Sequence, residues 1–148
     1  MNQAQLIVVF LCLSTINSAV VLNPITGITT KNLMYTGTVA VDAEKLFFTF
    51  YGFDGETNPD NLSQKPLIIA VGTPARSSQY INLASLGPKI LMESTLSDNS
   101  NRATTFANIL FLDCLGSGFS FASSATAIPK TMKDHATIVT KAINSFTS

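Results

Sequence analysis

Residues 66–72 read PLIIAVG and residues 107–113 read ANILFLD. Neither stretch alternates between apolar and polar residues, as a strand does when one of its faces meets water. A continuous apolar run of this length is typical of a strand covered on both faces, and helices on the two sides of a sheet provide that cover. The two stretches therefore predict the interior of a mixed sheet in an α/β domain.

An antiparallel hairpin is predicted before the first buried strand. Residues 34–41, MYTGTVAV, and residues 46–53, LFFTFYGF, are rich in β-branched and aromatic residues, and a short polar turn separates them. Two such runs joined by a short turn favour antiparallel pairing. Between the two buried strands, the sequence predicts a short helix over residues 78–86 and a short strand over residues 89–92.

The C-terminal residues predict an amphipathic helix. Its apolar side chains recur at spacings of four and three and form one stripe: Met132, Ala136, Val139, Ile143 and Phe146. In a mixed sheet, a helix in this place crosses over to a further parallel strand, and the sequence ends directly after the helix. We therefore expect the front part of an incomplete mixed sheet, with an open edge available to a protein partner.

The N-terminus predicts entry into the secretory pathway. Residues 6–13, LIVVFLCL, form an apolar run much shorter than the roughly 20 residues needed to span a bilayer. Small and polar residues follow up to Ala19, which is the pattern of a cleavable signal peptide over residues 1–19, with residues 20–148 as the mature domain. A buried core segment is the alternative, because residues 1–5 hold no Lys or Arg.

Two further features concern the compartment. The sequon Asn61-Leu62-Ser63 marks Asn61 as a candidate for N-glycosylation, which takes place in the secretory pathway. After the signal, no segment is apolar and long enough to span a membrane, so we expect no membrane association once the signal is removed. Together these features predict a secreted protein, or one in the lumen of a vacuole or lysosome.

The length and the charge of the chain limit its function. Its 148 residues are enough for one domain with a core of its own. Lys and Arg together number 9, as do Asp and Glu, and the formal net charge is +0. Because no basic stripe is present to neutralise phosphates, we expect no nucleic-acid partner.

Few residues are candidates for chemistry. Cys12 would leave with the signal, and Cys114 then stands alone after an apolar run, where we expect it to be buried. The helical spacing predicts a solvated face for His135, and Ser117 lies between two glycines in an expected turn. The sequence has neither metal-ligand spacing nor a phosphate-binding glycine loop, so we expect no metal, no cofactor and no catalytic residue.

Several blocks, taken in order, resemble the serine carboxypeptidase family. Residues 66–78 read PLIIAVGTPARSS and residues 83–88 read LASLGP, where the family has PLILWLNGGPGCSS and LxExGP. Residues 107–121 read ANILFLDCLGSGFSF, where the family has ANVLFLESPAGVGFSY. Residues 35–37 and 46–48 are similar to the family's first hairpin. The resemblance implies an α/β-hydrolase-type sheet and the removal of C-terminal residues from peptides.

The resemblance also identifies altered positions. Gly72 and Thr73 stand where the family has the two glycines of its oxyanion loop, and the Asn that precedes those glycines is deleted after Val71. In the family, that Asn and the Glu of LxExGP grip the terminal carboxylate of the substrate, and Ser85 replaces the Glu here. Arg76 replaces a cysteine of the family. These changes imply weakened recognition of a substrate.

Three hypotheses follow from these comparisons. The family's nucleophile lies in a GESYAG block that would come after Ser148, with its Asp and His further on. The chain is then an inactive carboxypeptidase-like protein that serves as a binding or assembly module. Alternatively, it is a fragment of a longer, active peptidase with a peptide substrate. The third hypothesis is an unrelated small secreted α/β protein.

Overall fold

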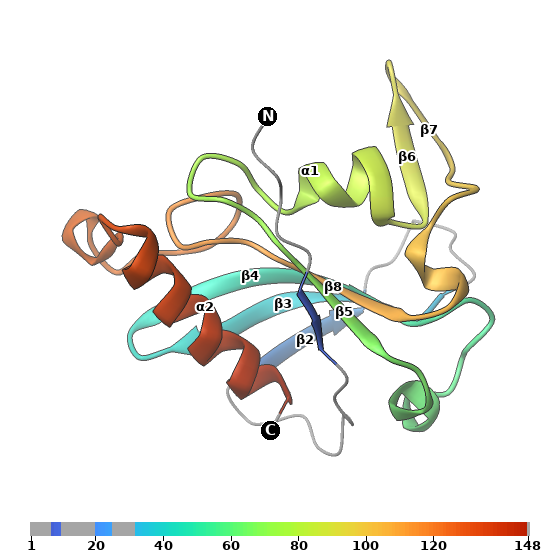
Figure 1. The fold of residues 1–148 in the computed structure, drawn as a ribbon, viewed down its shortest axis with the longest axis horizontal. Coiled ribbons are helices and arrows are strands. Elements are labelled where there is room, and N and C mark those ends of the chain that lie inside the picture. The colour runs from blue at the N-terminus through green and yellow to red at the C-terminus, as the bar shows by residue number, and fades with distance from the viewer. Residues whose placement is uncertain (1–6, 10–19, 25–31, 148) are drawn as a thin grey trace.

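A mixed sheet forms the centre of the computed structural model, which describes residues 7–9, 20–24 and 32–147. In this part of the chain the sheet has six strands in the order β1-β5-β8-β4-β3-β2 (Figure 1). The strands are β1 (Ile7–Val9), β2 (Val20–Pro24), β3 (Met34–Val41), β4 (Glu44–Tyr51), β5 (Leu67–Val71) and β8 (Asn108–Leu112). A separate hairpin of β6 (Lys89–Met92) and β7 (Thr95–Asp98) projects from the body of the molecule.

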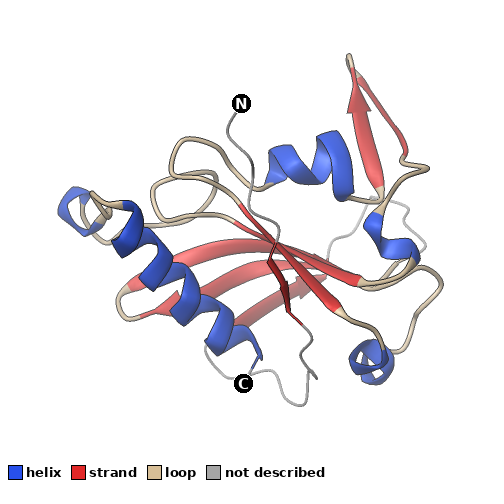
Figure 2. Cartoon of the chain, viewed as in Figure 1, coloured by secondary structure: helices blue, strands red, loops and turns tan. Residues whose placement is uncertain are grey.

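The helices lie on both sides of this sheet (Figure 2). The longest is α2 (Met132–Thr147), and a short helix, α1 (Gln79–Ile81), continues directly into the π-helical turn η2 (Asn82–Leu86). Three 3₁₀ turns complete the described part: η1 (Pro59–Gln64), η3 (Ala103–Thr105) and η4 (Ala125–Ala127). In that part, no helix is both long enough and apolar enough to cross a membrane.

The two predicted buried strands are confirmed at the centre of the sheet. β5 and β8 pair in parallel, and β4 joins β8 on its other side in antiparallel orientation. Every residue of β8 is buried. The apolar side chains of both strands enter two clusters, one beneath α2 and one beneath α1, η2 and η3. The continuous apolar sequence of β8 therefore reflects cover on both faces.

The predicted hairpin is also confirmed, as β3 and β4, whose pairing runs from Met34 opposite Tyr51 to Val41 opposite Glu44. β2, in contrast, was not predicted, because Asn23 and Pro24 favour turns. It pairs with the outer edge of β3 as an edge strand, where a proline at the strand end is tolerated. The fold is therefore a mixed α/β sheet, compatible with the predicted class.

The orientation of α2 corrects one prediction. Its buried residues are His135, Val139, Ala142 and Phe146, whereas Met132 is 70% exposed. The predicted solvated position of His135 is wrong, since this side chain is only 6% exposed. The predicted and observed stripes have the same period and share Val139 and Phe146. The period therefore predicted the helix correctly, but it did not determine which of two adjacent stripes of side chains packs against β3.

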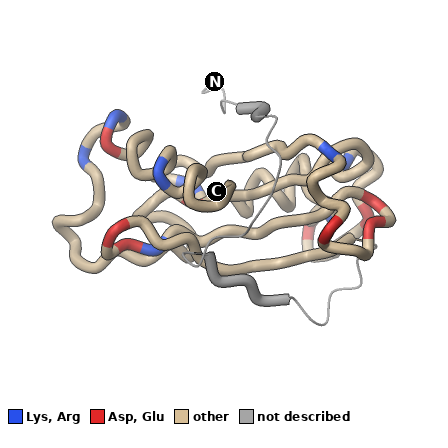
Figure 3. Tube along the Cα trace, turned by 90° about the horizontal axis from the view of Figure 1, so that it is seen from below, with Lys and Arg blue, Asp and Glu red and all other residues tan. Residues whose placement is uncertain are grey.

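The predicted signal peptide falls mostly outside the described residues. Only Ile7–Val9 of that stretch is described, as β1, and it pairs antiparallel with β5. Signal cleavage therefore stays a prediction. Acidic and basic residues are spread along the described trace in small groups of either sign (Figure 3), and the expectation of no nucleic-acid partner likewise stays a prediction.

Candidate functional site

Two loops meet at the carboxyl ends of the parallel strands. The first loop, residues 72–78, leaves β5, and the second loop, residues 113–121, leaves β8. Loops at this edge of an α/β sheet commonly form binding sites, because parallel strands end on the same side. The altered family positions of the first loop therefore lie beside the second loop.

A buried carboxylate connects the two loops. Asp113 is 0% exposed, and its Oδ1 accepts hydrogen bonds from Ser77 Oγ at 2.7 Å, from Ser78 Oγ at 2.7 Å and from Ser78 N at 2.6 Å. Its Oδ2 accepts a bond from Phe119 N at 3.1 Å. Four donors compensate the removal of this carboxylate from water. The sequence analysis missed this role, although an acidic residue directly after a buried strand requires such partners.

The second loop is shaped around that carboxylate. Gly118 has φ of 57°, and a Cβ added there would collide with Asp113 Oδ2. Ser117 donates two hydrogen bonds to Cys114 O, one from its Oγ and one from its N–H, each at 3.1 Å. Gly116 adopts a left-handed conformation with φ of 83°. The predicted turn is confirmed. The Ser117 hydroxyl stabilises this turn and does not donate to a side chain that could act as a catalytic base.

Gly72 and Thr73 use their main-chain N–H groups within the fold. Gly72 N donates to Leu112 O at 2.8 Å, and Thr73 N donates to Arg76 O at 2.8 Å. Arg76 N returns a bond to Thr73 O at 3.1 Å, which closes a tight turn. A Cβ on Gly72 would lie 2.7 Å from Ser78 N, so glycine is needed for this close approach. In this conformation neither N–H points to a free position.

Cys114 lies beneath the same turn. It is 4% exposed and free, as predicted, and its Sγ donates to Gly72 O at 3.1 Å. Burial raises the pKa of the thiol to about 11, and the negative charge of Asp113 adds to the increase. The thiol is therefore protonated at neutral pH and is a poor nucleophile.

Ser85 and Asn61 lie in other parts of the surface. Ser85 is exposed in η2, where its main-chain oxygen accepts a bond from Asn99 Nδ2 at 2.6 Å. Asn61 is half-buried in η1, and its Oδ1 accepts from Gln64 Nε2 at 3.2 Å. Ser63, the acceptor-motif serine, is exposed. The structure therefore places the sequon at the surface, while its use for glycosylation stays a prediction.

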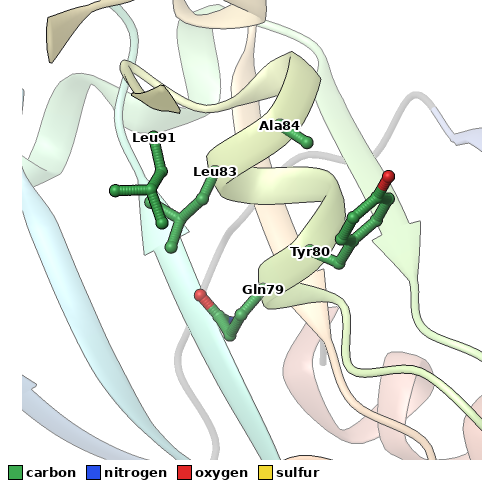
Figure 4. Close-up of a pocket in the computed structure, with 5 residues that line it drawn as sticks. All are labelled: Gln79, Tyr80, Leu83, Ala84 and Leu91. Atoms are coloured by element: carbon green, nitrogen blue, oxygen red, sulfur yellow. The ribbon is translucent and has the colours of Figure 1, made fainter. Parts of the chain in front are cut away.

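An apolar pocket opens beside α1. It has a volume of about 310 Å³ and is lined by side chains from α1, η2 and β6, namely Gln79, Tyr80, Leu83, Ala84 and Leu91 (Figure 4). The Arg76 guanidinium lies 4.3 Å from the centre of the Tyr80 ring. Among the described residues, Gln79 Nε2 is buried without a hydrogen-bond partner. Such a pocket can hold an apolar group.

The described residues contain no group of three or more His, Cys, Asp or Glu side chains placed to hold a metal ion. The expectations of no metal and no cofactor stay predictions. His135, the single histidine, is carried by α2, whereas Ser77 donates to Asp113. The loops thus bring Gly72, Thr73, Ser77 and Asp113 together. None of the hydrogen bonds described above joins a serine to an imidazole.

Comparison with known proteins gives one family. A family model described as serine carboxypeptidase matches residues 24–148, which include the hairpin, both buried strands and both loops. A search of curated proteins gave no match. The matched range covers the motifs on which the sequence resemblance rested.

Proposed function

Because this chain belongs to the serine carboxypeptidase family, we propose that it is a carboxypeptidase-like protein of the secretory pathway that does not hydrolyse peptides by itself. The observation that carries this proposal is the closed turn of the first loop. Serine peptidases stabilise the developing oxyanion with main-chain N–H groups that are free to receive it. Here Thr73 N is bonded to Arg76 O at 2.8 Å.

The serines of the two loops support the same proposal. A catalytic serine passes its proton to a histidine within hydrogen-bond reach. Ser77 Oγ instead donates to Asp113, and Ser117 Oγ donates to a main-chain oxygen. The Asp113 carboxylate already accepts four hydrogen bonds, and a main-chain oxygen is not a base, so neither acceptor activates its serine.

Substrate recognition is altered as well. In the family, an Asn and a Glu grip the carboxylate of the substrate, and this chain has a deletion after Val71 and a serine at Ser85. Ser85 is exposed and lacks the acidic group. The apolar pocket beside α1 favours retained binding of a ligand, so a non-catalytic binding or assembly module is the first alternative.

A longer, active peptidase is the second alternative. In such a protein the triad would come from residues beyond those described, and the Thr73 N–H would have to turn away from Arg76 O before it could bind an oxyanion. Peptides would then be the substrates. The same family membership accommodates both alternatives, and they differ in whether hydrolysis is measured.

The proposed compartment is the secretory or vacuolar lumen. Proteins of the serine carboxypeptidase family are typically found there, and the apolar N-terminal run and the sequon at Asn61 agree with that compartment. Expression of the 148-residue chain in a secreting eukaryotic host should give a product that begins near residue 20. Its mass should fall on glycosidase treatment, and Asn61→Gln should abolish that change.

The test of the function uses the same secreted protein. We expect no hydrolysis of N-blocked dipeptides with a free C-terminus above the background of the host preparation. The control is the double variant Ser77→Ala, Ser117→Ala, purified in parallel, because contaminating activity persists in both samples. Turnover that copurifies with the chain and disappears in the double variant would contradict the proposal.

A further inference from the structure

The outer edge of β5 is covered by a very short strand. On one side β5 pairs with β8, and on the other side it pairs with the three residues of β1. The register places Ile7 opposite Ile69 and Val9 opposite Leu67, in antiparallel orientation. β1 lies within residues 1–19, the predicted signal peptide.

The main-chain groups on that edge can be assigned from the ladder. Asn108 N donates to Pro66 O at 2.9 Å, and Gly72 N donates to Leu112 O at 2.8 Å. The N–H and C=O groups of Ile68 and Ala70, which lie between these two bonds, therefore face β8. Main-chain groups alternate in direction along a strand. The N–H and C=O groups of Leu67, Ile69 and Val71 therefore face the outer edge.

Signal cleavage would remove the cover from this edge. An apolar edge strand with free N–H and C=O groups is a template for pairing with another strand. The side chains of Leu67 and Ile69 are fully buried beneath α2, so β5 would keep its place in the core after β1 has left. The strand edge alone would change, from paired to open.

We propose that removal of residues 1–19 opens the β5 edge and that a second processed copy fills it by antiparallel pairing of β5 with β5. The inference rests on the secretory processing proposed above. A two-fold axis requires antiparallel strands, and β1 already occupies the edge in that orientation. The two sheets would then continue as one across the interface.

Self-pairing satisfies the edge when the two-fold axis lies between the Ile69 residues of the two copies. Leu67 then lies opposite Val71 of the second copy, so the outward-facing main-chain groups of one strand meet those of the other. Lys65 would lie opposite Thr73, and like charges do not meet across the strands. The net charge of +0 adds no repulsion between the copies.

The contact between the two strands is small. β5 has five residues, and pairing of two such strands buries less than the roughly 1,200 Å² at the low end of stable interfaces. We therefore expect a dimer that dissociates on dilution, with a dissociation constant on the order of micromolar or weaker.

The experiment compares two forms of the same chain. The form secreted by a eukaryotic host, with its N-terminus established by mass spectrometry, is compared with the unprocessed 148-residue chain made without secretion. Sedimentation velocity is recorded over a roughly hundredfold range of concentration around the expected constant. The processed form should shift from monomer to dimer as concentration rises, and the unprocessed form should stay monomeric.

A matched pair of variants tests the strand edge. Val71→Pro removes an outward N–H while the bonds to β8 remain, and Val71→Ala shortens the side chain but keeps the N–H. By symmetry, Val71→Pro removes two interface hydrogen bonds, so the dimer should weaken by about tenfold or more. Val71→Ala should dimerise like the parent, and circular dichroism is used to check that both variants fold.

Four results would overturn the proposal. The processed form could stay monomeric throughout the range, or it could form oligomers that Val71→Pro leaves unchanged. Equal dimerisation of the unprocessed chain would show that β1 does not cover the interface. A secreted product that keeps residues 1–19 would remove the premise, while the hydrolysis assay would still report on the proposed function separately.

Discussion

Strands β5 and β8 differ from the loops that leave them in how their polar groups are satisfied. In the strands, ladder hydrogen bonds pair the main chain, and apolar side chains fill both faces. In the loops, hydroxyl and N–H donors bond to one carboxylate, that of Asp113, or to main-chain oxygens within short turns, as Thr73 N does to Arg76 O. A sheet interior tolerates many apolar combinations, whereas a polar network depends on particular atoms. A family's sheet can therefore persist while its loops acquire different bonds.

The largest expected effect lies in the sheet. Phe48 on β4 is fully buried and packs edge-on against Phe146 of α2, with ring centroids 5.2 Å apart. Phe48→Ala should lower the free energy of unfolding by about 3–5 kcal/mol, because it leaves a cavity between sheet and helix. Phe106→Ala, at a side chain 60% exposed, is the control and should change it by less than about 0.5 kcal/mol. Equal losses in denaturant unfolding would contradict the assigned core.

A smaller loss is expected in the loops. Asp113→Ala removes the acceptor of Ser77 Oγ, Ser78 Oγ and two main-chain N–H groups, and should lower the free energy of unfolding by about 2–4 kcal/mol. Asp113→Asn has nearly the same shape and keeps one acceptor oxygen, so its loss should be about 1–2 kcal/mol. If denaturant unfolding shows Asp113→Ala to be neutral, the loops do not depend on this carboxylate.

The sequence predicted the elements whose cause is local or apolar. Residues 66–72 and 107–113 indicated buried strands because their side chains are apolar on both faces, and the structure confirms β5 and β8. The hairpin of β3 and β4 followed from two β-rich runs around a polar turn. The helix α2 followed from its period, and only the stripe that faces the sheet was misassigned, with Met132 exposed and His135 buried.

The candidate site was less accessible to sequence reasoning, because it depends on contacts between distant residues. Asp113 and Ser77 are 36 residues apart, and no local pattern predicts their bond. The bond from Thr73 N to Arg76 O depends on the turn adopted where the family has glycines. β1 and β2 pair at the two edges of the sheet, where short strands carry weak sequence signals.

The smallest predicted effect tests the junction between strand and loop through pH. Burial, with a contribution from Asp113, raises the pKa of Cys114 from 9.0 to about 11, so folding favours the protonated thiol. This contribution to stability is fully present below pH 9 and is lost as the pH rises through 11. At pH 10, midway between the two values, about 1 kcal/mol should be lost.

Cys114→Ala separates this loss from that of other groups. Tyr51 also has a pKa raised by burial, and it titrates in both proteins, so the difference between them reports on the thiol. Between pH 8 and pH 10, the free energy of unfolding should fall by about 1 kcal/mol more in the parent than in Cys114→Ala. Identical pH dependence in the two proteins would mean that the thiol is as accessible to water as an exposed cysteine, and the loops would then not seal the ends of β5 and β8.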